Sequence, residues 1–154
     1  MKARPGIYAN VHIELRDAKS GALREERKIH NLVVLGGAAM YGARIVGTAQ
    51  KAVDYMQIGR DGGTAAASTD TDINTSVDAR VTCDTAALTA NQTVVFKHTW
   101  TAGELSATGI SEAGLFNQRT AAAGTMLARA VFVTVNKTSS DTLKITWEVR
   151  VVPG

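Results

Sequence analysis

The segment Asp70-Thr-Asp-Ile-Asn74 places oxygen-bearing side chains at alternate positions, as the first half of a calcium-binding loop does. In such a loop the sixth position needs Gly for a sharp turn, and the twelfth needs a Glu that binds through both oxygens. This chain has Thr75 and Val81 at those positions, which excludes an EF-hand. A weak cation site in this segment stays open as an alternative.

Nucleophilic catalysis is the second chemistry to consider. The run Gly109-Ile-Ser-Glu-Ala113 nearly matches a nucleophile elbow, but Ala113 stands where the last Gly is required. The flanking segments also have strand patterns, whereas the elbow joins a strand to a helix. We therefore predict that Ser111 is an ordinary strand residue. Glu112 is either a buried partner or interface acid, or a solvent-facing strand residue.

The other reactive side chains are isolated from one another. His12, His30 and His98 fall on three different predicted strands, and none has metal-ligand spacing with another ligand residue. Cys83, the single cysteine, excludes an intrachain disulfide, fits a reducing cytoplasm, and is predicted to be a small apolar strand residue. The glycine-rich run at residues 59–63 lacks the spacing and the Lys of a phosphate-binding loop. We predict no catalytic, metal or cofactor site, and no enzyme.

Length and charge limit the other classes of protein to which the chain could belong. The chain has 154 residues, of which 45% are hydrophobic, so one packed domain is expected. Its net charge of +3 is too small to indicate nucleic-acid binding. Residues 1–30 carry seven Lys or Arg and four acids, whereas residues 61–93 carry five Asp and one Arg, a split that suits packing against a charged partner or neighbouring copy. The apolar stretch 32–49 is interrupted by glycines and is too short for a membrane span, and no signal peptide is predicted.

Alternation of apolar and polar residues is clearest in Thr142–Val152, which we predict to be a strand with Trp147 on its inner face. The polar run Asn136–Asp141 has the length of a hairpin turn and joins it to the predicted strand Thr125–Val135. Together with Gly109–Asn117, these segments are predicted to be three neighbouring strands of one sheet. Val131 is expected to share the inner face with Trp147.

The rest of the chain predicts more strands and one helix. The helix is expected at Val33–Val46 after an Asn31 cap, and the Ala/Thr/Ser/Asp-rich stretch Ala65–Ser76 is expected to be a long loop. Further strands are predicted at Ile7–Leu15, Leu23–His30, Val53–Gly59, Ala79–Asp84 (extending as far as Leu88) and Thr93–Thr101. The predicted fold is an all-β antiparallel jelly roll or β-sandwich of about eight strands with one short helix near residues 33–46. It forms a single domain at residues 7–154, after an extended arm at residues 1–6.

Several segments, in this order, resemble small structural proteins of tailed bacteriophages, most of all capsid cement or decoration proteins of jelly-roll type. These segments are Asn31–Val46, Met56-Gln-Ile-Gly59, Ile110–Asn117, Met126–Phe132 and Lys137–Trp147. The resemblance covers residues 31–152 and implies no catalytic residue. It implies a protein made in the host cytoplasm and located on the capsid surface of the virion. Its implied partners are the major capsid protein and its own copies, as a trimer or dimer, without direct nucleic-acid or membrane contact. A tail, neck or fibre component that acts as an adaptor or binding module is the alternative.

Two segments are candidates for contacting the capsid or a neighbouring subunit. The basic arm carries Lys2 and Arg4, and the acidic loop region carries Asp61, Asp70 and Asp72. We expect such segments to be mobile and to become ordered on docking. Simple fraying of a terminus and a loop is the alternative.

Overall fold

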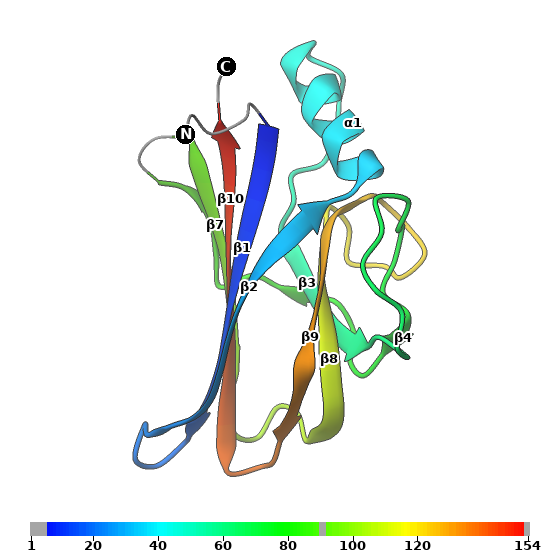
Figure 1. Ribbon diagram of the computed structural model, residues 1–154. Helices are drawn as coiled ribbons and strands as arrows, with labels where there is room; N and C mark the ends of the chain where they lie inside the picture. Colours follow the sequence, from blue (N-terminus) through cyan, green and yellow to red (C-terminus); the bar gives the residue numbers. More distant parts are fainter. Residues whose placement is uncertain (1–5, 90–91, 153–154) are drawn as a thin grey trace, which may run out of the picture.

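The computed structural model describes residues 6–89 and 92–152, which form ten strands and one helix, α1 (Leu35–Ile45) (Figure 1). The strands are β1 (Gly6–Asp17), β2 (Leu23–Val33), β3 (Tyr55–Arg60), β4 (Thr75–Ser76), β5 (Val81–Thr82), β6 (Thr85–Leu88), β7 (Thr93–Trp100), β8 (Ala107–Phe116), β9 (Met126–Lys137) and β10 (Asp141–Val152). Each predicted strand is present, and the segment predicted near Ala79–Asp84 with its extension to Leu88 forms β5 and β6. Strand β4 falls within the predicted loop Ala65–Ser76. Gly6, predicted to end the arm, is the first residue of β1.

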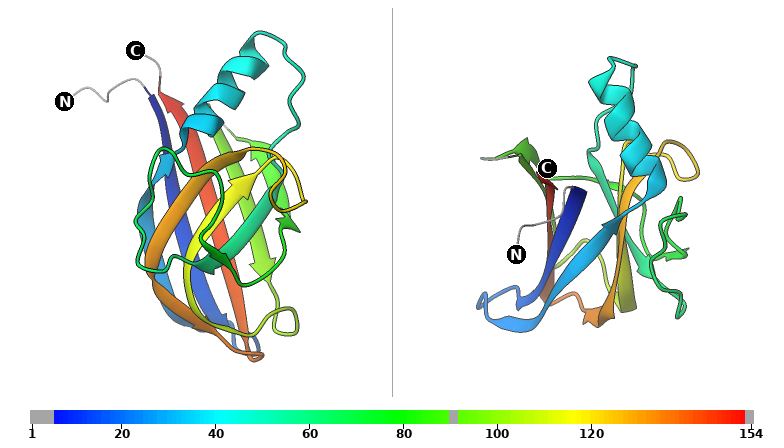
Figure 2. Two further views of the ribbon diagram at one scale, coloured as in Figure 1. Left: turned by 90° about the vertical axis from the view of Figure 1, so that its right-hand side faces the viewer. Right: turned by 45° about the horizontal axis from the view of Figure 1, so that its top comes forward.

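The strands form two antiparallel sheets that pack face to face, with α1 at one end (Figures 1 and 2). The first sheet has the order β2-β1-β10-β7-β6, and the second has β9-β8-β3 with β4 and β5 along β3. Strand β2 connects the sheets, because it pairs with β1 along most of its length and with β9 through Leu32 and Val33. The predicted all-β sandwich with one short helix is confirmed.

The prediction of three neighbouring strands is correct for β8 and β9 and wrong for β10. Strand β10 lies in the other sheet, between β1 and β7. Residues between β9 and β10 therefore connect the two sheets and do not close a hairpin within one sheet. The reason is that β1 offers β10 an uninterrupted antiparallel ladder, from Gly6 opposite Val152 to Asp17 opposite Asp141.

The core between the sheets is built around Trp147, which is fully buried with Ile145 and Val149, as predicted. The prediction for Val131 is wrong. Phe132 faces the core instead, while Val131 is only half-buried and lies outside the core cluster. The β8–β9 ladder is irregular between residues 110 and 112, and this irregularity brings β9 back to the core at Val135.

Helix α1 begins after Val34, whose side chain makes no capping bond, whereas Asn31 lies within β2. The predicted Asn31 cap is therefore wrong, because β2 continues three residues further than expected before the chain turns. Gly37 lets the helix approach β9, since a Cβ there would lie 2.3 Å from the Leu127 carbonyl oxygen. Among the described residues, no helix has the length and apolar character needed to cross a membrane.

Candidate functional site

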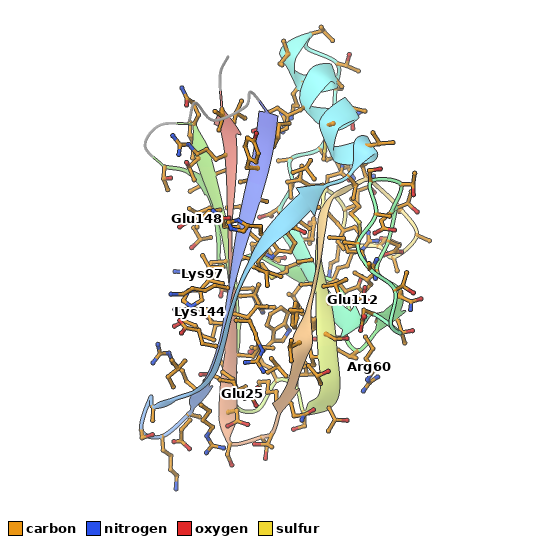
Figure 3. All side chains as sticks on the ribbon, in the orientation of Figure 1. Glu25, Arg60, Lys97, Glu112, Lys144 and Glu148 are labelled. Atoms are coloured by element: carbon orange, nitrogen blue, oxygen red, sulfur yellow. The ribbon has the colours of Figure 1, made fainter. Side chains whose placement is uncertain are left out.

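One charged feature of the interior is an ion pair between β8 and β9. Arg129 lies on β9. Glu112 lies on β8 and is labelled in Figure 3. Glu112 has no exposed surface. The Arg129 Nε donates to Glu112 Oε2 at 2.8 Å, and its Nη2 lies 2.7 Å from the same oxygen. Of the two alternatives for Glu112, the buried partner is correct.

This ion pair fastens the loop at residues 61–74 onto the second sheet. Arg129 Nη1 donates to Asp70 at 2.9 Å, and Glu112 Oε1 accepts the backbone N–H groups of Asn74 and Thr75 at 2.8 and 3.2 Å. Burial alone would lower the pKa of Arg129, but the bonds from Asp70 and Glu112 outweigh it and raise that pKa above its usual value. The guanidinium is therefore a permanent charge that requires these acceptors.

A second buried arginine holds the same region. Arg80 has its guanidinium carbon 3.6 Å from the centre of the Phe116 ring, and its Nη2 lies 3.3 Å from Asp72. Its Nη1 donates to the carbonyl oxygens of three residues in the loop after β8: Gln118, Thr120 and Ala123. Arg80 and Arg129 were not predicted as interior residues, although Arg129 is the single charge in the apolar run Met126–Phe132.

The acidic residues predicted to face a partner are thus bonded within the chain. Asp70 and Asp72 bond to the buried arginines, and Asp61 accepts a hydrogen bond from the Ser111 hydroxyl. Ile73, between Asp72 and Asn74, is also buried. Lys2 and Arg4 lie outside the described residues.

The structure does not bring the reactive side chains together. His12 lies 2.6 Å from Glu26, His30 lies 2.6 Å from Asn10, and His98 packs edge-on against Trp100. Within residues 6–89 and 92–152, no group of three His, Cys, Asp or Glu is placed to hold a metal ion.

Cys83 is buried, and burial raises the pKa of its thiol to about 12, with Asp54 and Asp84 acting in the same direction. The thiolate is the reactive form of a cysteine, so this residue is suited to packing and not to nucleophilic chemistry.

The clearest binding feature is an apolar crevice of about 380 Å³ between the two sheets, at the end where α1 lies. Its walls come from the inner faces of both sheets, from α1 and from the segment before β3. The lining residues are Met40, Tyr41, Arg44, Lys51, Ala52, Val53, Ala86, Val94, Phe96, Leu127 and Val149. The volume lies within the range of about 300–1,000 Å³ that is typical of ligand pockets.

Two large apolar side chains are exposed where α1 ends. Ile45 is 81% exposed and Val46 76%, and both directly follow Arg44, which lines the crevice. We call these two residues the helix-end patch. Single exposed apolar residues are common, but neighbouring ones next to an apolar crevice are typical of an interaction site.

No family model, curated protein or solved structure matches the chain. The crevice and the helix-end patch are therefore candidate sites on geometry alone. Sequence reasoning missed them because their residues come from α1, the segment before β3, β6, β7, β9 and β10, which only the tertiary fold brings together.

Proposed function

We propose that this protein is a structural binding protein that attaches to another protein through the helix-end patch. Following the resemblance to phage decoration proteins, the proposed partner is the major capsid protein, whose lattice it would cement from the outer surface. The observation that carries the proposal is the exposure of Ile45 and Val46 next to the apolar crevice. Burying these two side chains against a partner would contribute favourably to the free energy of binding, whereas in the isolated chain they stay exposed.

The size of this burial free energy supports attachment through repeated contacts. Burying an exposed Val, Leu or Ile side chain contributes about 1.5–3 kcal/mol before the cost of association is subtracted. One patch of two such residues gives modest affinity. Copies joined as a dimer or trimer would gain avidity on a lattice that repeats the partner site. The rest of the molecule suits this role, because the buried arginines fasten its loops to a rigid sandwich.

The test is occupancy on the virion of the phage that encodes the chain. We expect hundreds of copies on the capsid and much lower occupancy for the double variant Ile45→Asp, Val46→Asp, without a change in melting temperature. Val133→Asp is the matched control, because Val133 is 72% exposed but lies on β9, outside the helix-end patch. Its occupancy should equal that of the wild type.

Two outcomes would change the proposal. Absence from the particle, or equal occupancy for the double variant, would contradict it. A handful of copies located on the tail would replace the capsid role with the tail, neck or fibre alternative.

A further inference from the structure

Two cations border the crevice. Arg44 and Lys51 are both exposed and are the only charged residues that line it. In the described part of the chain, neither lies within salt-bridge distance of a carboxylate, whereas Arg80 and Arg129 both do. The crevice therefore combines apolar walls with an uncompensated positive rim.

From this combination we infer that the crevice receives an apolar side chain from an acidic segment of the partner protein. An apolar group fills the space between the sheets, and flanking carboxylates meet Arg44 and Lys51 at the rim. Opposite charges at a rim favour encounter and orientation more than they add affinity. The inference rests on the proposed function, since it names the kind of partner segment that the helix end would bind.

The chain's own acidic and terminal segments are poor occupants. A second copy could offer the loop around Asp70 and Asp72, but these carboxylates bond to Arg129 and Arg80 and the intervening Ile73 is buried. A second copy could also offer residues 1–5, but this segment contains two cations and no acid, so it would meet charge of the same sign. A different protein is the occupant that the charges favour.

The first test uses NMR chemical shifts of the ¹⁵N-labelled full chain, titrated with a capped Asp-Leu-Phe-Asp peptide or a capped Lys-Leu-Phe-Lys peptide. We expect saturable shifts at the crevice with the acidic peptide and weaker binding of the basic one. The double variant Arg44→Glu, Lys51→Glu should lower the affinity for the acidic peptide by about 2- to 25-fold, which is the range expected for two exposed charge pairs. Lys19→Glu with Arg60→Glu changes the net charge equally away from the crevice and should leave binding unchanged.

The second test separates the apolar part of the site from the charges. Ala86 lines the crevice and lies opposite Phe96, which also lines it, whereas the next residue, Ala87, lies opposite Val95 and does not line it. Both alanines are exposed on the edge strand β6. Ala86→Trp should therefore fill the crevice and abolish peptide binding, while Ala87→Trp should bind as the wild type does.

Equal binding of the two peptides, or unchanged binding in Ala86→Trp, would overturn the inference. Binding of dodecanoate without binding of either peptide would also overturn it, because the crevice would then belong to a lipid-like ligand. These outcomes are distinct from failure of the proposed function. Virion occupancy that depends on Ile45 and Val46 but not on Arg44 and Lys51 would leave the proposed function intact and refute only the acidic partner segment.

Discussion

Replacing Arg129 with Met tests whether the buried ion pair holds the second sheet and its loop together. Arg129 is almost completely buried and bonds to two carboxylates, Glu112 and Asp70, and to the carbonyl oxygens of Thr64 and Ala65. Met has a similar apolar length but no donor. The variant therefore leaves the fully buried Glu112 without its cation and releases Asp70 from the sheet.

The expected cost follows from that unpaired carboxylate. Removing one partner of a buried ion pair typically destabilises a protein by about 3–5 kcal/mol. A domain is stable by only about 5–15 kcal/mol, so this loss would be a large part of the total. In urea, with a slope of about 2 kcal/mol per molar, the unfolding midpoint should fall by about 1.5–2.5 M. Hydrogen exchange should also accelerate at the Asn74 and Thr75 amides, which bond to Glu112.

The control is the double variant Glu112→Gln, Arg129→Met. The amide oxygen can still accept from Asn74 and Thr75, and no charge remains buried without a partner. The double variant should therefore be more stable than Arg129→Met alone, although it has lost one more native group. The reasoning is refuted if Arg129→Met lies within about 1 kcal/mol of the wild type, or if the second substitution destabilises the protein further.

Three further predictions concern the rest of the sandwich. Trp147→Ala should cost about 3–5 kcal/mol in chemical denaturation, because the side chain is fully buried, and a near-wild-type midpoint would contradict its place in the core. Burial raises the pKa of Glu14, but bonds from Lys144 and Arg16 outweigh it and lower that pKa from 4.5 to about 2. Glu14 therefore stabilises the fold above about pH 4.5, by about 1–2 kcal/mol after screening at the half-exposed cations. This contribution should be lost as the pH falls toward 2. The variant Glu14→Gln should not show this loss. Cys83, with a thiol pKa of about 12, should react with Ellman's reagent at pH 8 more than about a hundredfold faster after unfolding in guanidinium, and rapid labelling of the native protein would contradict its burial.

Much of the fold could be predicted because strand periodicity is a local property. Alternation in Ile7–Leu15 and Thr142–Val152 identified two strands that form the longest ladder in the sheet, and it placed Trp147 inside. Composition failed for the predicted loop Ala65–Ser76, whose last two residues form β4. Its small polar residues resemble a mobile segment, but two arginines elsewhere in the chain need its carboxylates and carbonyl groups once they are buried.

The helix-end patch and the crevice also show what the sequence could and could not predict. The sequence predicted the helix, and in the structure Gly37 packs against β9. It gave no indication that Ile45 and Val46 would remain exposed, or that Arg44 would lie beside a crevice lined by Val94 and Val149. No spacing rule connects these residues, because three different elements supply them.

By itself, therefore, the sequence determined the all-β class, the positions of most strands and the residues able to form a core. The tertiary structure decided which strands are neighbours and which charged groups are buried. A period of two specifies which residues of one strand share a face, but it does not specify the partner strand. Strand β10 pairs with β1 and not with β9 because the ladder to β1 continues over the whole strand. Glu112 and Arg129 can be buried because pairing of β8 with β9 brings their opposite charges together.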